Sequence, residues 1–340
     1  MMKRLPQLLA LCLLALPALH GQPNWNNLGM YRLNKVQPHD RIVPEGKWSM
    51  SLNGTWSFAY FDAPGAIRTP VGQLPLRDTI HVPGNMELQG YGVPVYVNMR
   101  NEFPPNPPYA PTAYNPVGVY GRTFTLPEHW KGRRVIVKFG AAKSALYLYV
   151  NGTEVGYSQD SKTPAEWDIT KYLHEGKNDL RAKVLRWCDG SYLECQDMWR
   201  MSGLTRDVEL YSVPWTYITD IKIVSDLDTN DWRTGRLDVM VDLNREVGGG
   251  SIEWRLERGD WSVRGRQQLE RNDWFTSFAR NVGTVEPWSD STPALYTLTL
   301  RLLAANGNEI ERIVKRWASA MWTYGADCCA STGAPWRFAV

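Results

Sequence analysis

The residues best suited to chemistry gather in one stretch of the chain, Leu185–Gly203, where charged, polar and aromatic side chains are mixed. Its charged residues are Arg186, Asp189, Glu194, Asp197 and Arg200. A carboxylate in such a stretch can accept hydrogen bonds from sugar hydroxyls or supply one oxygen to a hard cation. In the alternative interpretation, the charges form a salt-bridge network that holds strand ends together. In a β-sandwich, either arrangement places this stretch at a loop end.

Composition and motifs exclude several other kinds of site. The 340 residues carry 38 Lys and Arg against 35 Asp and Glu, and the net charge of +3 is too small to indicate a nucleic-acid partner. The five histidines are scattered, without an HExxH motif or a Cys/His cluster, so no zinc site is expected. Neither a P-loop nor a GxGxxG motif occurs, which argues against a nucleotide-dependent enzyme. Sixteen Trp and sixteen Tyr suit strand-rich cores and sugar-binding surfaces alike.

The first residues, Met1–Gly21, predict a secretory signal peptide, because a charged start precedes the apolar run Leu8–Leu16. That run is too short for a membrane span, and no other stretch approaches one. We therefore expect an exported protein, periplasmic or secreted. The cysteines after this leader are too few for a disulfide framework. Cys188 and Cys195 could pair across a loop, but buried free thiols are favoured.

Alternating apolar and polar residues dominate the chain and predict antiparallel strands. Leu146–Val150 and Thr153–Tyr157 flank Asn151-Gly152, which tolerates the positive φ angles of a type I′ turn, so we predict a hairpin there. Leu52–Phe58 repeats this pattern around another Asn-Gly pair. Further strands are predicted at Arg134–Phe139, Asp179–Trp187 and Arg206–Tyr211. The proline-rich segment Asn98–Pro116 is expected to be a long ordered loop.

A domain boundary is predicted at Val213-Pro214. Beyond it, alternating segments predict strands at Thr219–Ser225, Arg236–Leu243, Gly250–Glu257, Leu295–Leu303 and Glu309–Lys315. Short strands over about a hundred residues are typical of an immunoglobulin-like sandwich. The residues alone therefore predict an all-β chain with two sandwich domains.

Five segments carry a resemblance to a known family. The most specific is RWCDGSYLECQDMWRMSG at Arg186–Gly203. The others are LNGTW at Leu52–Trp56, VPGNM at Val82–Met86, VPVYVN at Val93–Asn98 and GYSQDS at Gly156–Ser161. Together they resemble the N-terminal region of a glycoside hydrolase family 2 β-galactosidase. The resemblance implies a jelly-roll sugar-binding domain with an N-terminal arm over residues 22–213, followed by an immunoglobulin-like domain over residues 214–316.

The resemblance also assigns two substrate-binding residues. Asn98 matches the family's Asn that contacts galactosyl hydroxyls, and Asp189 matches the Asp that binds substrate and ligates a sodium ion. This chemistry is reasonable, since an amide donates and accepts hydrogen bonds and a hard cation prefers oxygen ligands. For Asn98 the alternative is an ordinary turn residue. Glu194, Asp197 and Arg200 are expected to support the loop.

Cofactors and partners follow from the resemblance as well. It implies a β-galactoside or oligosaccharide as ligand and a sodium site that is incomplete in this chain. It also implies magnesium in the full-length family, with ligands that this chain lacks. The N-terminal region would contribute to oligomer contacts. No nucleic-acid partner and no membrane span are expected.

The family's catalytic (β/α)₈ barrel is expected to be absent. A barrel takes about 250 residues and carries the two catalytic Glu, whereas only residues 317–340 follow the immunoglobulin-like domain. This tail matches no family segment. Codons can be chosen for it so that a one-base shift yields VGFRNV and then RVNGRAVALRGVN. We interpret the tail as the product of a frameshift.

Three functions remain open from the sequence. The first is a β-galactosidase by ancestry, which hydrolyses terminal β-D-galactosides when complete but is truncated here, without catalytic residues, and inactive alone. The second is a non-catalytic carbohydrate-binding protein. The third is an assembly fragment that complements a chain carrying the barrel.

Overall fold

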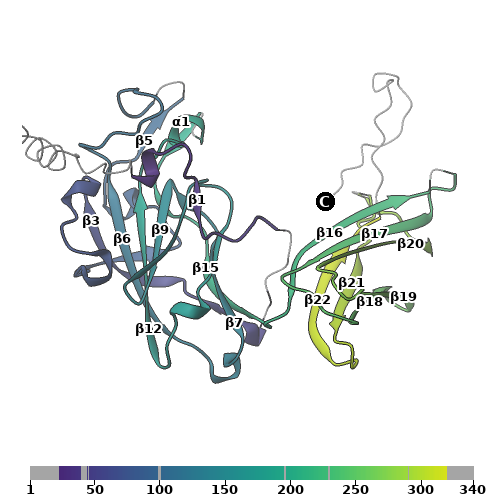
Figure 1. Ribbon diagram of the computed structural model, residues 1–340. Helices are drawn as coiled ribbons and strands as arrows, with labels where there is room; N and C mark the ends of the chain where they lie inside the picture. Colours follow the sequence, from purple (N-terminus) through teal and green to yellow (C-terminus); the bar gives the residue numbers. More distant parts are fainter. Residues whose placement is uncertain are drawn as a thin grey trace, which may run out of the picture.

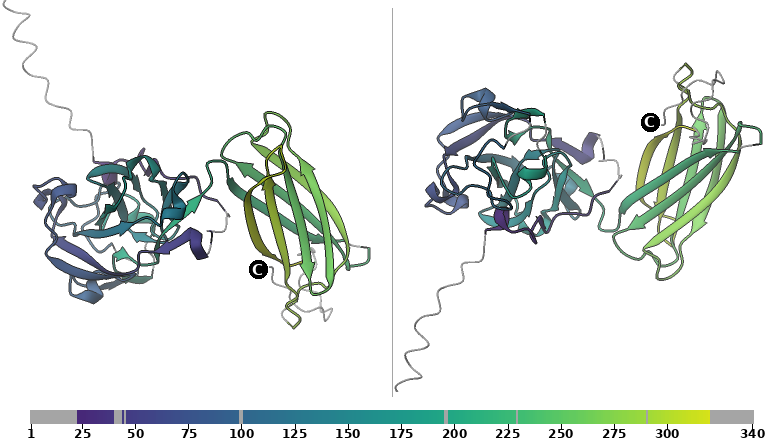
Figure 2. Two further views of the ribbon diagram at one scale, coloured as in Figure 1. Left: turned by 90° about the horizontal axis from the view of Figure 1, so that it is seen from below. Right: turned by 90° about the horizontal axis from the view of Figure 1, so that it is seen from above.

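The regular secondary structure of the chain is almost entirely β-strand, and it is arranged in two bodies (Figures 1 and 2). The computed structural model describes residues 23–39, 44, 46–98, 101–194, 197–228, 230–289 and 291–319. The expected leader, Cys195 and residues 320–340 of the expected aberrant tail lie outside this part of the chain. An all-β jelly roll followed by an immunoglobulin-like sandwich is confirmed, and the described residues form no barrel.

The first sandwich consists of two main antiparallel sheets. In spatial order, the seven strands of the larger sheet are β1 (Arg32–Leu33), β10 (Thr153–Ser158), β9 (Ala145–Val150), β12 (Lys177–Leu185), β6 (Val117–Thr125), β3 (Gly54–Phe61) and β4 (Asp78–Val82). The smaller sheet contains β11 (Ala165–Asp168), β7 (Arg134–Phe139), β15 (Val208–Val213) and β2 (Ser49–Ser51). Two short ribbons pair β13 (Met198–Arg200) with β5 (Val95–Val97), and β14 (Gly203–Leu204) with β8 (Ala142–Lys143).

Helical segments in the described residues are short. They are α1 (Ser191–Glu194) and the 3₁₀ turns η1 (Asn24–Asn26), η2 (Gly46–Trp48), η3 (Pro64–Ala66), η4 (Val71–Gln73), η5 (Glu87–Gln89), η6 (Glu128–Trp130) and η7 (Thr170–Tyr172). Over its described residues 101–116, the proline-rich segment is a loop without strands, as predicted.

Around β9, both faces of the larger sheet are buried, and this places the loops of the site. On the inner face, Trp56 and Tyr120 pack with Trp167 of the smaller sheet in the main core. On the outer face, Tyr147 and its neighbours form a second apolar cluster that η1 and the proline-rich loop cover. Every residue of β9 is therefore buried, although its neighbour β10 begins at an exposed turn. Covering the outer face brings segments distant in sequence to the end of β12.

The predicted hairpin is confirmed, because β9 and β10 pair around Asn151 and Gly152, whose φ angles are 49° and 81°. The similar pattern around Asn53 has another outcome. β2 pairs with β15 in one sheet and β3 pairs with β4 and β6 in the other, so this segment passes between sheets. The Asn53 side chain explains the difference, since it bonds the Asp207 carboxylate at 2.9 Å and accepts the Val208 N–H at 2.9 Å.

The second sandwich has a three-stranded sheet against a four-stranded one. The first contains β16 (Ile218–Leu227), β17 (Thr234–Leu243) and β20 (Phe275–Thr284), and the second contains β19 (Trp261–Gln268), β18 (Ser251–Arg258), β21 (Tyr296–Leu303) and β22 (Glu309–Trp317). Five of these strands were expected from alternation, whereas β19 and β20 were not. β19 is an edge strand with mostly polar side chains, and Gly265 supplies only backbone beneath Trp254. Its inward positions are Trp261 and Val263, which pack on the core, followed by Gly265 and Gln267, so the apolar alternation is too short to stand out in the sequence.

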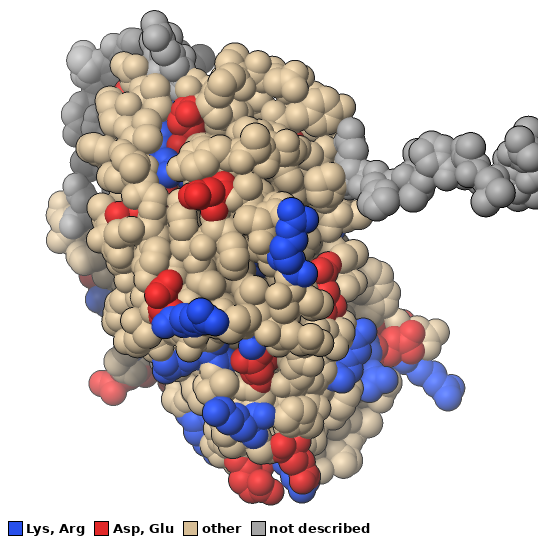
Figure 3. Space-filling view, turned by 90° about the vertical axis from the view of Figure 1, so that its left-hand side faces the viewer, with Lys and Arg blue, Asp and Glu red and all other residues tan. Residues whose placement is uncertain are grey.

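In the described part of the chain, no helix has the length and apolar character that crossing a membrane requires. On the face of the molecule shown in Figure 3, cationic and anionic side chains are interspersed, with broad areas that carry neither.

Candidate functional site

Asp189 lies in the tight turn that connects the end of β12 to α1. Its backbone N–H donates to the carbonyl of Trp25 at 2.9 Å, so η1 of the N-terminal segment holds the turn from outside. Its carboxylate Oδ1 accepts the N–H of Gly190 at 2.9 Å. The residue is only 6% exposed, although it belongs to a loop. The carboxylate is thus fixed in direction before any ligand arrives.

The electrostatics of Asp189 reflect this burial. Burial raises the pKa of the carboxyl group, while hydrogen bonds from Gln159 and Gly190 act in the opposite direction. The side-chain amide of Gln159 also donates to the hydroxyl of Tyr157 at 2.8 Å. A carboxylate in this setting retains acceptor capacity for hydroxyl groups, because each oxygen offers two lone-pair directions.

Aromatic and thiol groups surround the turn. Trp187 packs against Phe103 of the proline-rich loop with ring centroids 5.0 Å apart, and Phe103 contacts Tyr192 at 5.4 Å. Tyr192 fastens the same loop, since its hydroxyl donates to the Tyr109 carbonyl at 3.0 Å. Cys188 is a buried free thiol, and burial raises its pKa to about 11. The favoured expectation of a buried thiol therefore holds for Cys188.

Asn98 occupies a different position at the same loop cluster. It follows β5 and is exposed, and its carbonyl accepts the N–H of Asp197 at 3.2 Å. β5 and α1 lie at the same end of the first sandwich (Figure 1). The structure thus places Asn98 and Asp189 in one region but holds them through different partners, Asp197 in one case and Trp25 in the other.

An exposed aromatic pair accompanies Asn98 on the β5–β13 ribbon. Tyr96 and Trp199 meet edge to face with centroids 5.7 Å apart, and they are 54% and 55% exposed. The Tyr96 hydroxyl donates to the Asp197 carboxylate at 2.8 Å. Leu193 of α1 is 90% exposed. We call Tyr96 and Trp199 the aromatic rim.

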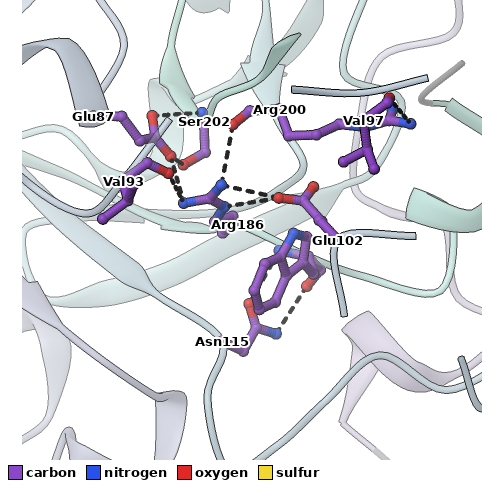
Figure 4. A network of polar contacts seen from close by, with 9 residues as sticks. Glu87, Val93, Val97, Glu102, Asn115, Arg186, Arg200 and Ser202 are labelled. Carbon is purple, nitrogen blue, oxygen red and sulfur yellow. Dashed lines mark hydrogen bonds and ion pairs between the residues drawn. The ribbon is translucent and has the colours of Figure 1, made fainter. Parts of the chain in front are cut away.

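A buried arginine holds these segments together (Figure 4). The guanidinium of Arg186 contacts the Glu102 carboxylate at 2.9 Å and the Glu87 carboxylate at 3.3 Å, and the side chains of all three are under 10% exposed. It also donates to the carbonyls of Val93 and Arg200, each at 3.0 Å. Because Val93 and Glu102 flank Asn98 along the chain, this network fixes both ends of the Asn98 segment.

The side chains expected to support the loop have identifiable partners. Glu194 accepts the N–H of Ser161 at 2.7 Å, and Arg200 donates to the carbonyl of Val97 at 3.3 Å. Within the described residues, Nε and Nη1 of Arg200 are buried without a hydrogen-bond partner. The supporting interactions run to other segments rather than among the charges of Leu185–Gly203.

Sequence reasoning did not single out Glu87, Glu102 or Gln159 as parts of the site. Gln159 stands in the GYSQDS segment that carried the resemblance, so that segment offered a signal. Glu102 lies near the start of the proline-rich loop, and its buried contact with Arg186 gives it a part in the site that its sequence context does not reveal. Glu87 likewise takes part only through contacts distant in sequence. Its carboxylate accepts hydrogen bonds from the hydroxyl and the N–H of Ser202, at 2.6 and 2.8 Å.

A metal site needs several ligating side chains close together. Among the described residues, no group of three or more His, Cys, Asp or Glu is placed to hold a metal ion. Asp189 supplies a single carboxylate in its turn, and one carboxylate does not make a site for a hard cation.

Comparisons with known proteins match both sandwiches. The model described as "Glycosyl hydrolases family 2, sugar binding domain" matches residues 49–214, and that described as "Glycosyl hydrolases family 2" matches residues 216–317. A β-galactosidase of Priestia megaterium is 38% identical over 323 residues, which cover 86% of this chain and 31% of the relative. A β-galactosidase of Pectobacterium atrosepticum is 38% identical over 313 residues, covering 87% and 29%. The chain thus spans less than a third of these curated relatives.

Solved structures share the fold. Bifidobacterium dentium β-glucuronidase, in complex with coumarin-3-O-glucuronide, aligns with a TM-score of 0.64 at 21% identity over 83% of this chain and 50% of that chain. Ruminococcus gnavus β-glucuronidase aligns with a TM-score of 0.63 at 17% identity, covering 83% and 46%. At this level of identity the likeness concerns the arrangement of strands.

Proposed function

The chain belongs to glycoside hydrolase family 2, and on that premise we propose that it forms the sugar-binding and immunoglobulin-like part of a β-galactosidase. The substrate class would be terminal β-D-galactosides. Curated relatives at 36–38% identity, all named β-galactosidase, support this choice. The solved neighbours named β-glucuronidase are about half as similar in sequence and do not bear on the substrate.

The observation that carries the proposal is the buried carboxylate of Asp189, whose orientation is set by its hydrogen bond with Gly190. It accepts the Gly190 N–H while its backbone is tied to Trp25. We assign this carboxylate to accept hydrogen bonds from sugar hydroxyls, and the Asn98 amide to both donate and accept at the same ligand. A rigid acceptor lowers the entropic cost of binding a small polar ligand.

Catalysis itself would require groups outside the two sandwiches. Retaining glycosidases use two carboxyl groups about 5–5.5 Å apart, one as nucleophile and one as acid/base. We assign no residue of this chain to either role and propose that the chain alone binds galactosides without hydrolysing them. A sodium ion would take one ligand from Asp189, and magnesium would be held elsewhere. The exported location expected from the sequence belongs to the same proposal.

The decisive experiment compares sugar binding by the chain and by Asp189→Asn. The chain is titrated with methyl β-D-galactopyranoside and, separately, with its C4 epimer methyl β-D-glucopyranoside, while amide signals are followed by NMR. We expect saturable binding that favours the galactoside. Because the variant loses a charged acceptor, its affinity should fall about tenfold or more.

Asp260→Asn is the matched control. It makes the same chemical change in the turn between β18 and β19, in the other sandwich, and should bind like the parent chain. Equal affinity for both epimers, or an Asp189→Asn variant that binds as tightly as the control, would refute the proposed role.

A second candidate function, assembly with a barrel-bearing chain, is favoured by the aromatic rim. Tyr96 and Trp199 expose apolar surface on the ribbon that Asn98 follows, and exposed apolar patches mark interaction surfaces. Mixing the chain with a separately produced remainder of the Priestia megaterium β-galactosidase tests this idea. Co-elution that Trp199→Glu abolishes would support it, and separate elution at micromolar concentrations would oppose it.

A further inference from the structure

The four-stranded sheet of the second sandwich carries a groove rich in arginine. β19, β18, β21 and β22 lie side by side in that order (Figure 1). Residues from all four strands line a groove of about 630 Å³. Its arginines are Arg255, Arg264, Arg266, Arg301 and Arg312, and its glutamates are Glu253 and Glu257. Positive charge therefore prevails along this face.

The strand register sets these arginines against one another. Arg255 and Arg264 are direct cross-strand partners, and so are Arg301 and Arg312. Like charges in directly opposite positions destabilise a sheet. A bound anion would relieve this repulsion wherever the chain itself supplies no carboxylate.

On the β21–β22 side of the groove, the chain does supply carboxylates. Glu309 contacts Arg301 at 2.6 Å and Arg312 at 2.9 Å. Glu253 contacts Arg301 as well, at 2.7 Å. Two carboxylates thus compensate the two arginines of this side.

On the β19 side, compensation is incomplete. Arg255 contacts Glu257 at 2.8 Å, but among the described residues neither Arg264 nor Arg266 forms an ion pair. The Nε of Arg266 donates to a neutral group, the hydroxyl of Ser251, at 2.9 Å. Both arginines are exposed on the edge strand β19, two positions apart, so their side chains leave the same face of the sheet about 7 Å from each other. Uncompensated positive charge lies there.

The mixture of donors and acceptors indicates the class of ligand. Arginine only donates, and its planar fork binds an oxyanion such as a carboxylate or a sulfate through two parallel bonds. The carboxylates of Glu253 and Glu257 only accept, and their ion pairs engage Oε2 alone. A ligand with both anionic groups and hydroxyls can satisfy both kinds of side chain, as an acidic sugar does.

The lining also disfavours a protein or nucleic-acid partner. Its aromatic member, Trp254, is only 4% exposed, and no aliphatic side chain is among the lining residues. Protein partners depend on buried aromatic or aliphatic anchors, and single-stranded nucleic acids depend on aromatic rings that stack on bases.

We propose that this groove binds an acidic oligosaccharide through Arg264 and Arg266. These two guanidinium groups hold its carboxylate or sulfate groups, and the carboxylates of Glu253 and Glu257 accept its hydroxyls. The groove lies in the second sandwich and includes none of the residues assigned to galactoside binding, so the two sites are independent.

The test is calorimetric titration of the full chain in low salt. Trigalacturonic acid supplies carboxylates, a sulfated galactotriose supplies sulfates, and plain galactotriose supplies hydroxyls alone. We expect saturable binding of an acidic trisaccharide at least about tenfold tighter than that of galactotriose, because charge-assisted hydrogen bonds are the stronger ones. The tighter of the two acidic ligands identifies the anionic group.

Arg264→Gln and Arg266→Gln should each weaken this binding by about tenfold. Arg236→Gln is the matched control, since it removes the same charge from an exposed side chain of β17, in the other sheet of this sandwich. It should bind like the parent chain, and so should Asp189→Asn.

Several outcomes would overturn the inference. The first is equal affinity for the acidic and neutral trisaccharides, and the second is parental affinity in both Arg264→Gln and Arg266→Gln. Sodium sulfate or hexaglutamate binding as tightly as the acidic trisaccharides would show a site for free anions or for an acidic protein instead. Loss of galactoside binding in Asp189→Asn bears on the proposed function alone.

Discussion

At the scale of single residues, Arg186 does the most to hold the candidate site together. Its buried guanidinium meets two carboxylates, Glu87 and Glu102, and two backbone carbonyls. A planar fork with five donors can satisfy four acceptors in fixed directions, which the single ammonium of a lysine cannot do. The residue therefore links η5, the Asn98 segment and β13.

Replacing Arg186 should destabilise the first sandwich strongly. Arg186→Met leaves two buried carboxylates without their cation, and losing one partner of a buried pair costs about 3–5 kcal/mol. Urea denaturation followed by tryptophan fluorescence measures the loss. Arg255→Met is the control, since its pair with Glu257 is largely exposed and should contribute less than about 1 kcal/mol. Similar losses in both variants would contradict this account.

The sequence predicted only part of this site, for a physical reason. Asn98 and Asp189 were identified because they stand in segments that resemble the family, and their roles remain predictions. The partners of Arg186 and Asp189 could not be found by spacing. Gln159, Glu102 and Trp25 approach the turn only because the chain packs across the outer face of the larger sheet, and no local pattern encodes such contacts.

At the scale of elements, turn chemistry and burial decided which predictions succeeded. Asn151-Gly152 adopts the positive φ angles that its composition favours, and the hairpin forms as predicted. The same dipeptide at Asn53-Gly54 instead connects two sheets. The Asn53 side chain is hydrogen-bonded to Val208, the first residue of β15, and to Asp207 before it. β19 and β20 were missed, since the inward positions of each strand mix apolar and polar side chains and the apolar alternation is too short to stand out.

The far end of the N-terminal arm, residues 23–39, gives a pH prediction. Glu166 of β11 accepts hydrogen bonds from His39 of the arm and from Tyr211. Burial alone would raise the pKa of this carboxyl group, but the bonds from His39 and Tyr211 outweigh burial and lower it below its ordinary value of 4.5. A group with a lowered pKa in the folded state contributes stability above its unfolded pKa and loses that contribution as pH falls.

We therefore expect the free energy of unfolding to fall as the pH drops below 4.5, and part of that fall to disappear in Glu166→Gln. Urea denaturation at a series of pH values measures it. Glu175→Gln, at an almost fully exposed carboxylate, should follow the parent curve. If Glu166→Gln shows the same pH dependence as the parent, the arm is not held by this carboxylate.

At the scale of the whole molecule, the two sandwiches have separate apolar cores. Residues 214–217 join β15 to β16, and at this joint Tyr217 packs against a small cluster of Ile136, Tyr211 and Val213, while the Arg134 guanidinium lies over the Trp215 ring, 4.9 Å from its centroid. Domains joined this way unfold as separate cooperative units.

Differential scanning calorimetry should therefore show two transitions. Leu298→Asp buries a charge in the centre of the second core and should abolish one transition while leaving the other within a few degrees. Galactoside should raise only the transition that survives, because the candidate site lies in the first sandwich. A single transition, lost altogether in Leu298→Asp, would show that the sandwiches unfold as one unit.

The pairing of β1 with β10 has a consequence for solubility. β1 is two residues long, includes Arg32, and covers an edge of the larger sheet that would otherwise present unpaired N–H and C=O groups. Short, charged edge strands protect sheets from pairing with other chains. A chain that releases its arm would uncover β10 as a template for a second copy. Loosening the arm should therefore lead to concentration-dependent self-association before the sandwich itself unfolds.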